Sequence, residues 1–124
     1  MKWWTKRMER TIQLMETHLN IDLGNPPFLK LDNGLQIPYS SIKGITTGRP
    51  IPNAFKLYGF SFGGTRNGLF RFNGGYHLYF FYNEVDTLHF DLNNFLVGKF
   101  KISKLIIDVK NPEEISKTIS ERLT

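Results

Sequence analysis

The chain of 124 residues contains no cysteine, which excludes disulfides, thiolate metal sites and cysteine nucleophiles. Its apolar runs are short. Leu78 to Tyr82 is one of the longest, far below the roughly 20 residues that a membrane-spanning helix needs. The first ten residues, MKWWTKRMER, carry charges where a secretion signal has its apolar stretch. These absences predict a cytoplasmic protein.

Acidic residues are missing from a long central stretch. Between Asn33 and Asn83 there is no Asp or Glu, although the chain as a whole carries 11 of them. The same stretch contains five basic residues: Lys43, Arg49, Lys56, Arg66 and Arg71. A second basic group, Lys99, Lys101 and Lys104, follows later. This pattern leaves two interpretations open, a solvated basic surface or a surface that attracts phosphate-bearing partners.

The glycine-rich stretch SFGGTRNGLFRFNGGYHLYFF, residues 61–81, lacks the features of a phosphate-binding loop. Such a loop ends in Gly-Lys-Ser/Thr and starts a helix, whereas here LFRF follows and is typical of a strand. The glycine spacing also fails the dinucleotide-binding pattern. We therefore expect these glycines to occupy hairpin turns: Gly63, Gly64, Gly68, Gly74 and Gly75.

Residues that carry catalysis or bind metals are also few. The three histidines, His18, His77 and His89, lack the spacing of zinc ligands, although His77 and His89 could be neighbours on adjacent strands. Gly-x-Ser-x-Gly is absent, and the acids Glu84 and Asp86 fall in a predicted turn. The sequence thus predicts no catalytic residue, no metal site and no cofactor.

Residues 1–23 are predicted to form an N-terminal amphipathic helix, separate from a domain at 24–124. Apolar residues recur at helical spacing, and Gly24-Asn25-Pro26-Pro27 would end the helix. The stripe consists of Trp4, Met8, Ile12, Met15 and Leu19. Three roles are open for it: packing on the domain, contact with anionic lipid through its tryptophans, and a homodimer seam.

From Phe28 onward the apolar residues follow the period of two that is typical of strands. FLKL-DNG-LQIP predicts a hairpin around Asn33-Gly34. Five further strands are predicted at 56–60, 68–72, 76–82, 85–92 and 101–109. A closing helix is predicted after Asn111, with Pro112 at its first position and Ile115, Ile119 and Leu123 on one apolar face.

Four segments, in this order, are similar to the bacterial pleckstrin-homology-like (PH-like) domains: LQIPYSSIKGI, KLYGFSFGGTRNGLFRF, LYFFYNEVDTLHFDL and LIIDVKNPEEISKTI. The resemblance covers about residues 28–124 and leaves out the first segment. It implies a mainly β fold, a seven-stranded bent antiparallel barrel or sandwich capped by a C-terminal helix. It implies no catalytic residues.

We therefore predict a noncatalytic PH-like binding or scaffold domain that engages a protein partner or the anionic inner face of a membrane. The expected binding residues are basic, with two tryptophans as anchors: Lys43, Arg49, Arg66, Arg71, Trp3 and Trp4. The alternatives are a module that dimerises through the N-terminal helix and a weak nucleic-acid binder. Nucleic acid is disfavoured because the sequence lacks an RNA-recognition signature.

Overall fold

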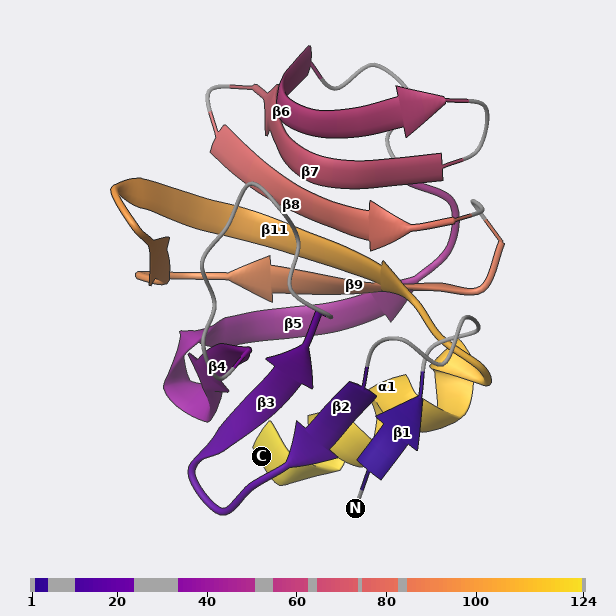
Figure 1. Ribbon diagram of the computed structural model, residues 1–124. Helices are drawn as coiled ribbons and strands as arrows, with labels where there is room; N and C mark the ends of the chain where they lie inside the picture. The colour runs from indigo at the N-terminus through magenta and orange to yellow at the C-terminus, as the bar shows by residue number, and fades with distance from the viewer. Residues whose placement is uncertain are drawn as a thin grey trace.

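The computed structural model describes residues 2–4, 11–23, 34–50, 55–62, 65–73, 75–82 and 85–123, and these form two sheets and one α-helix (Figure 1). The protein is mainly β. In chain order the elements are β1 (Lys2–Trp4), β2 (Thr11–Leu14), β3 (His18–Asp22), β4 (Leu35–Pro38), a 3₁₀ turn (Tyr39–Ser41), β5 (Ile42–Thr47), β6 (Phe55–Phe62), β7 (Thr65–Phe72), β8 (Gly75–Phe81), β9 (Thr87–Leu92), β10 (Leu96–Val97), β11 (Phe100–Asp108) and α1 (Pro112–Leu123).

The smaller sheet contains four antiparallel strands in the order β1-β2-β3-β4. The predicted N-terminal helix is therefore wrong, because its described residues 2–4, 11–14 and 18–22 are strands. Leu19 and Ile21 are fully buried while Asp22 is exposed, which is the alternation of a half-buried strand. Half of the hairpin predicted around Asn33-Gly34 lies outside the described residues. Its second strand, 35–38, is confirmed as β4.

The larger sheet is mixed, with strand order β5-β9-β11-β8-β7-β6 and β10 added to the beginning of β11. β11 runs parallel to β8 and antiparallel to β9. The five predicted strands between 56 and 109 are confirmed as β6, β7, β8, β9 and β11. A seven-stranded bent antiparallel barrel or sandwich was predicted. The described part of the chain is mainly β as expected, but its strands form a mixed sheet with a parallel pair and a separate small sheet, and no closed barrel.

Gly68 lies inside β7 and pairs with Gly59 of β6 and Tyr79 of β8, so its expected place in a turn is also wrong. Gly75 likewise begins β8. Gly63, Gly64 and Gly74 lie outside the described residues.

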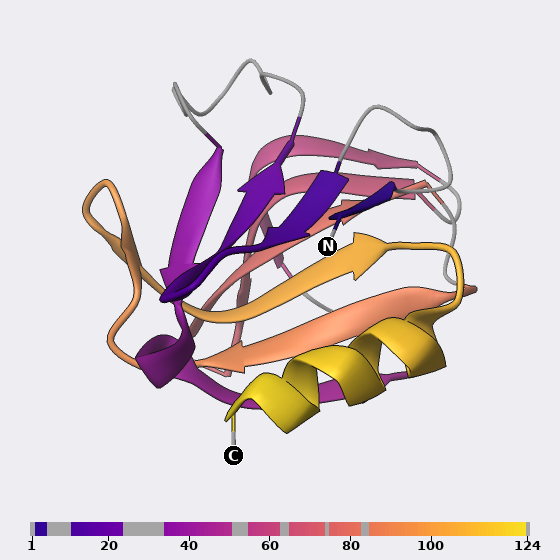
Figure 2. The ribbon, with the colours of Figure 1, turned by 90° about the horizontal axis from the view of Figure 1, so that it is seen from below.

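The closing helix is confirmed. α1 begins at Pro112, its first turn carries Glu113 and Glu114, and the carbonyl of Asn111 accepts the first helical hydrogen bond from the Ile115 N–H at 3.2 Å. Ile115 and Ile119 are buried. Figure 2 shows the helix lying along β5 and β9 at one edge of the mixed sheet.

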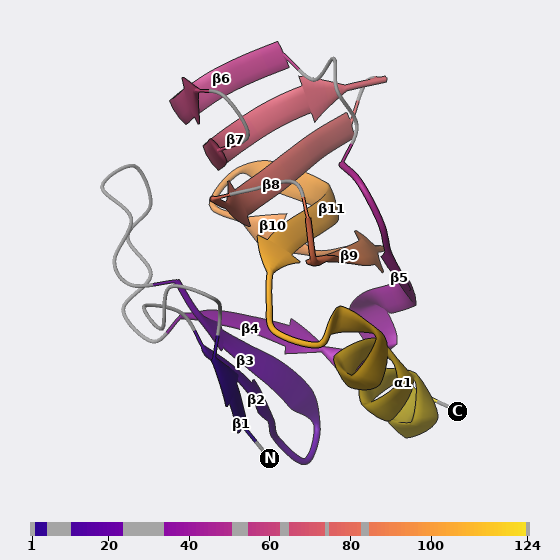
Figure 3. The same ribbon diagram turned by 90° about the vertical axis from the view of Figure 1, so that its right-hand side faces the viewer.

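One hydrophobic core joins the small sheet, the mixed sheet and the helix. In Figure 3 the small sheet lies below the strongly twisted mixed sheet, and its buried residues contribute to the same core as Phe90, Leu105 and Ile115. A second, smaller aromatic cluster, Phe70, Tyr79, Phe81 and Ile106, is built on the opposite face of the mixed sheet. We call that face the outer face.

Candidate functional site

The mixed sheet divides the predicted basic residues between its two ends. Lys43 lies at the beginning of β5 and Arg71 near the end of β7, at the end of the sheet where β8 and β11 also begin. We call this the hairpin end, because the β10–β11 hairpin projects from it (Figure 1). Arg66 and Arg49 lie at the opposite end, which leads into α1 and which we call the helix end.

The two arginines of β7 also point to different faces of the sheet. Arg66 pairs with Phe81 on the outer face, and its guanidinium carbon lies 5.5 Å from the ring centre of Tyr79 and 6.0 Å from that of Phe81. Arg71 pairs with Tyr76 on the core face. The four predicted cations therefore do not form one patch.

The predicted anchors Trp3 and Trp4 belong to β1, where they pair with Ile12 and Thr11. Their side chains lie outside the described part of the structure. The backbone register places them in the small sheet, not on an independent amphipathic helix.

A row of alternating cations and rings crosses the hairpin end. The guanidinium of Arg71 lies 5.6 Å from the ring centre of Tyr76, which meets the ring of Phe100 edge-on at 5.0 Å. The ammonium of Lys99 lies 5.5 Å from the ring centre of Phe100. Both rings are half-buried against the core and both cations are exposed. Cation–π attraction thus holds two exposed charges over the rings that close this end of the core.

The β10–β11 hairpin carries an exposed apolar side chain between lysines. Val97 pairs with Phe100, so Gly98 and Lys99 form a two-residue turn, and Gly98 takes the left-handed φ of 59° that such turns require. Leu96 is 60% exposed and pairs with the exposed Lys101. The hairpin therefore presents one leucine with two lysines nearby.

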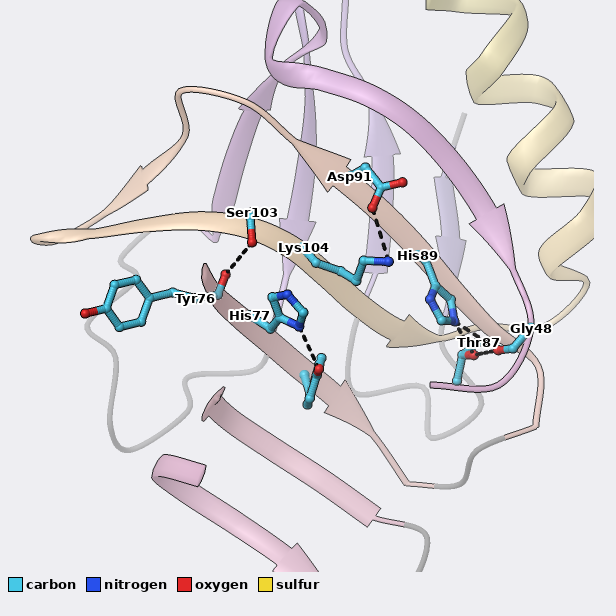
Figure 4. Close-up of polar contacts among 9 residues, drawn as sticks. Gly48, Tyr76, His77, Thr87, His89, Asp91, Ser103 and Lys104 are labelled. Atoms are coloured by element: carbon cyan, nitrogen blue, oxygen red, sulfur yellow. Dashed lines mark hydrogen bonds and ion pairs between the residues drawn. The ribbon is translucent and has the colours of Figure 1, made fainter. Parts of the chain in front are cut away.

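Charge at the hairpin end is strongly unbalanced. Besides Lys43, Arg71, Lys99 and Lys101, exposed Lys56 lies here, because it pairs with Phe70 of β7. Asp91 is the one carboxylate that the described strands place here, and it already pairs with Lys104 at 3.2 Å (Figure 4). Among the residues that the structure describes, the exposed cations at this end therefore outnumber the carboxylates, which favours a positive local potential.

Behind this surface, the outer face holds a polar row in which Lys104 lies between His77 and Asp91 in register. Only His77 is buried, since the side chains of Lys104 and Asp91 are 22% and 40% exposed. His77 is 6% exposed, and its Nδ1 shares a hydrogen bond of 2.7 Å with the hydroxyl of buried Tyr79 (Figure 4). Burial, assisted by the charge of Lys104, lowers the pKa of His77 to about 4. Burial raises the pKa of Tyr79 to about 12, opposed by the Arg66 charge. At neutral pH both groups are uncharged, which suits a structural role in a buried position.

The suggestion that His77 and His89 are neighbours on adjacent strands is wrong, because β11 separates β8 from β9. His89 pairs with Ile106, one row away from His77 on the outer face. Its Nε2 lies 2.9 Å from the Gly48 carbonyl and 3.0 Å from the Thr87 hydroxyl, which also donates to Gly48 (Figure 4). Burial lowers the pKa of His89 despite the Gly48 hydrogen bond.

A small pocket of about 210 Å³ opens at the helix end. It is lined by residues of both charges and two threonines: Thr47, Gly48, Arg49, Val85, Asp86, Thr87, Pro112 and Glu113. The Thr47 hydroxyl donates to Glu113 at 3.5 Å. The pocket's charges are mixed in sign, unlike those of the hairpin end.

Two further kinds of site can be examined in the described residues. No group of three His, Asp or Glu side chains among them comes together in a way that could hold a metal ion. Within the same part of the chain, no helix is long and apolar enough to cross a membrane.

Sequence reasoning found the basic residues but missed Leu96, Tyr76 and Phe100 as parts of one surface. The signal for the hairpin was present, because Gly98-Lys99 between apolar Val97 and Phe100 is typical of a tight turn. The meeting of Tyr76 with Phe100 depends on the parallel pairing of β8 with β11. A pattern local to the sequence does not reveal that pairing.

Comparison of the chain with protein-family models, with curated proteins and with solved structures finds no match to any of them.

Proposed function

We propose that this chain is a noncatalytic binding or scaffold domain that engages an anionic partner through the hairpin end of its mixed sheet. The observation that carries the proposal is a group of exposed cations at this end. Two of them, Arg71 and Lys99, lie over the rings of Tyr76 and Phe100, and no described carboxylate forms an ion pair with either. Exposed charges of one sign steer and orient a partner of the opposite sign.

The resemblance of residues 28–124 to PH-like domains supports a noncatalytic role. The mixed sheet departs from the all-antiparallel barrel that the resemblance implies, since β8 and β11 are parallel. The proposal therefore rests on the surface. The polar groups with perturbed pKa values support it too, because His77 and Tyr79 are buried and hydrogen-bonded to each other.

A triple neutral variant tests the proposal: Arg71→Gln, Lys99→Gln and Lys101→Gln. Its matched control removes the same net charge from exposed residues outside the hairpin end: Arg49→Gln, Lys110→Gln and Lys117→Gln. The measurement is the salt concentration that elutes each full-length protein from immobilised heparin, used as a generic polyanion. We expect the hairpin-end variant to elute at clearly lower salt than the control, because the lost cations all lie at one end of the sheet.

Equal elution of the two variants would mean that only net charge matters and would overturn the proposed site. Far-ultraviolet circular dichroism and thermal unfolding of both variants verify that the comparison is made between folded proteins. All six side chains are exposed, so stability should change by no more than about 0.5 kcal/mol per substitution.

A further inference from the structure

The tip of the β10–β11 hairpin extends beyond the neighbouring strands. β10 pairs with Phe100 and Lys101, whereas β8 joins β11 only from Ile102 and β9 only from Lys104. The hydrogen bond of 2.8 Å from the Ile102 N–H to the Phe95 carbonyl fixes the base of the hairpin. Its tip is therefore placed to meet a flat surface before the rest of the sheet does.

The two faces of the hairpin differ in polarity. Val97 is buried and Phe100 half-buried, which directs one face to the core. Leu96 and Lys101 pair on the other face, and both are exposed. The exposed face of the hairpin therefore carries Leu96 directly opposite Lys101, with Lys99 in the adjoining turn.

On this basis we infer that the partner of the hairpin end is an anionic lipid bilayer, into whose interfacial region the hairpin inserts Leu96. The inference rests on the proposed function and names its partner. Lys99 and Lys101 contact the lipid phosphates on either side of the inserted side chain, and Arg71 lies behind them at the headgroups. A bilayer matches this surface because its phosphates lie next to an apolar layer across its whole area.

An acidic protein would match the cations equally well but would need a pocket for one projecting leucine. The bilayer accepts that side chain at any lateral position. The rings of Tyr76 and Phe100 contribute indirectly, since they hold Arg71 and Lys99 by cation–π contact close to the protein surface. Charge complementarity and the projecting leucine together favour lipid.

The absence of cysteine provides a direct test, because a single cysteine introduced into the full chain can be labelled at one site. Leu96→Cys carries an environment-sensitive fluorophore. The matched control is Val85→Cys, at another exposed apolar position, 52% exposed, at the helix end. Both are mixed with vesicles of phosphatidylcholine alone and of phosphatidylcholine with phosphatidylserine.

We expect a blue shift of the emission only for the label at position 96 and only with phosphatidylserine present. In vesicle co-sedimentation, unlabelled Leu96→Ser should bind roughly tenfold more weakly than the native chain, since it removes about one buried leucine side chain from the bilayer. The residue is exposed, so this variant should fold like the native chain.

The remaining outcomes separate the two proposals. Vesicle binding without a shift at position 96 would overturn the insertion of Leu96 while leaving an electrostatic binding surface. Retention on heparin that depends on the hairpin end, with no binding to anionic vesicles, would overturn the lipid partner and direct the search to acidic proteins. Heparin retention that ignores the hairpin end would overturn the proposed function itself.

Discussion

The two ends of the mixed sheet both carry polar and charged side chains, but at the helix end these form internal hydrogen bonds, whereas at the hairpin end several are exposed cations. At the helix end, polar groups connect different elements: Thr87 and His89 hold the Gly48 carbonyl, and the Asp108 carboxylate accepts a hydrogen bond of 2.9 Å from the Tyr82 N–H. At the hairpin end, Arg71 and Lys99 lie over rings and are exposed to solvent. The first arrangement stabilises the fold, and the second leaves charge available for a partner.

The comparison also corrects the meaning of the acid-free stretch from 33 to 83. Its basic residues looked like one patch along the sequence. In the fold, Lys43, Lys56 and Arg71 lie at the hairpin end, while Arg66 lies among the rings of the outer face at the other end. The chain later adds Lys99 and Lys101 to the hairpin end. Basic residues that follow one another in the sequence can therefore be assigned to one surface only after the strand order is known.

The largest effect we expect concerns buried His77, in the polar row behind the hairpin end. The folded-state pKa of His77 is about 4, below its ordinary value of 6.5, so the unfolded chain binds more protons between these values. Stability contributed by neutral His77 is complete above pH 6.5 and falls as the pH is lowered toward 4, by roughly 3 kcal/mol in total. Urea unfolding of the native chain and of His77→Phe, measured across this range, should show a smaller acid-induced loss for the variant.

Phe70→Leu is the matched control for His77→Phe, because Phe70 pairs with His77 and does not titrate. It should lower stability by a similar amount at every pH. If the acid-induced loss is the same in His77→Phe as in the native chain, His77 does not carry the pH dependence and does not have the structural role that we assign to it.

At the helix end, Asp108→Ala should lower the free energy of unfolding by about 2 kcal/mol, because it leaves the Tyr82 N–H without its carboxylate acceptor. Asp108 is fully buried. Elution from heparin at a temperature where the variant is folded should not decrease. Elution of the variant at lower salt, without loss of stability, would contradict the assignment of a structural role to the helix end and a binding role to the hairpin end.

Most strands between residues 55 and 108 could be predicted from the sequence because short stretches rich in apolar and aromatic residues, alternating in TLHFDL and continuous in residues 78–82, are separated by Gly and Asn. The prediction of a helix for the N-terminal segment was wrong for a physical reason. Ile12 and Leu19 fit both a helical spacing and two short strands joined by a turn at Met15-Glu16-Thr17, and the turn was not recognised. Leu19, Ile21 and Leu23 are buried with Asp22 exposed between them, which was the local evidence for a strand.

The candidate surface could be predicted only in part. Composition indicated the cations, and Gly98 indicated a turn. Neither could place Phe100 against Tyr76. β9 and β10 lie between β8 and β11 in the sequence, although β8 and β11 are neighbours in the sheet, and such long-range parallel pairing has no local signature. By contrast, Arg66 and Arg71 point to opposite faces because they are five residues apart on one strand, whose side chains alternate between the two faces.

A pair of double variants tests the division of charge more sharply. Lys43→Gln with Arg71→Gln removes two cations from the hairpin end, and Arg49→Gln with Arg66→Gln removes two from the helix end. We expect the first pair to weaken binding to phosphatidylserine vesicles by about tenfold, since each basic residue near an anionic surface contributes up to about 1 kcal/mol. The second pair should change binding by less than about threefold. The reverse ranking in co-sedimentation would exchange the roles of the two ends.

The smallest effect belongs to the pocket at the helix end. Glu113 lies in the first turn of α1, where its negative charge complements the helix dipole, and it accepts a long hydrogen bond of 3.5 Å from Thr47. Glu113→Gln keeps the side-chain shape and an acceptor oxygen but removes the charge, so thermal unfolding should report a loss of only about 0.5 kcal/mol. Glu121→Gln, exposed in the last turn of the same helix, is the control and should be neutral or slightly stabilising, because a negative charge there opposes the dipole. Equal losses for both variants would mean that helix electrostatics do not stabilise this end, and that its polar contacts act through geometry alone.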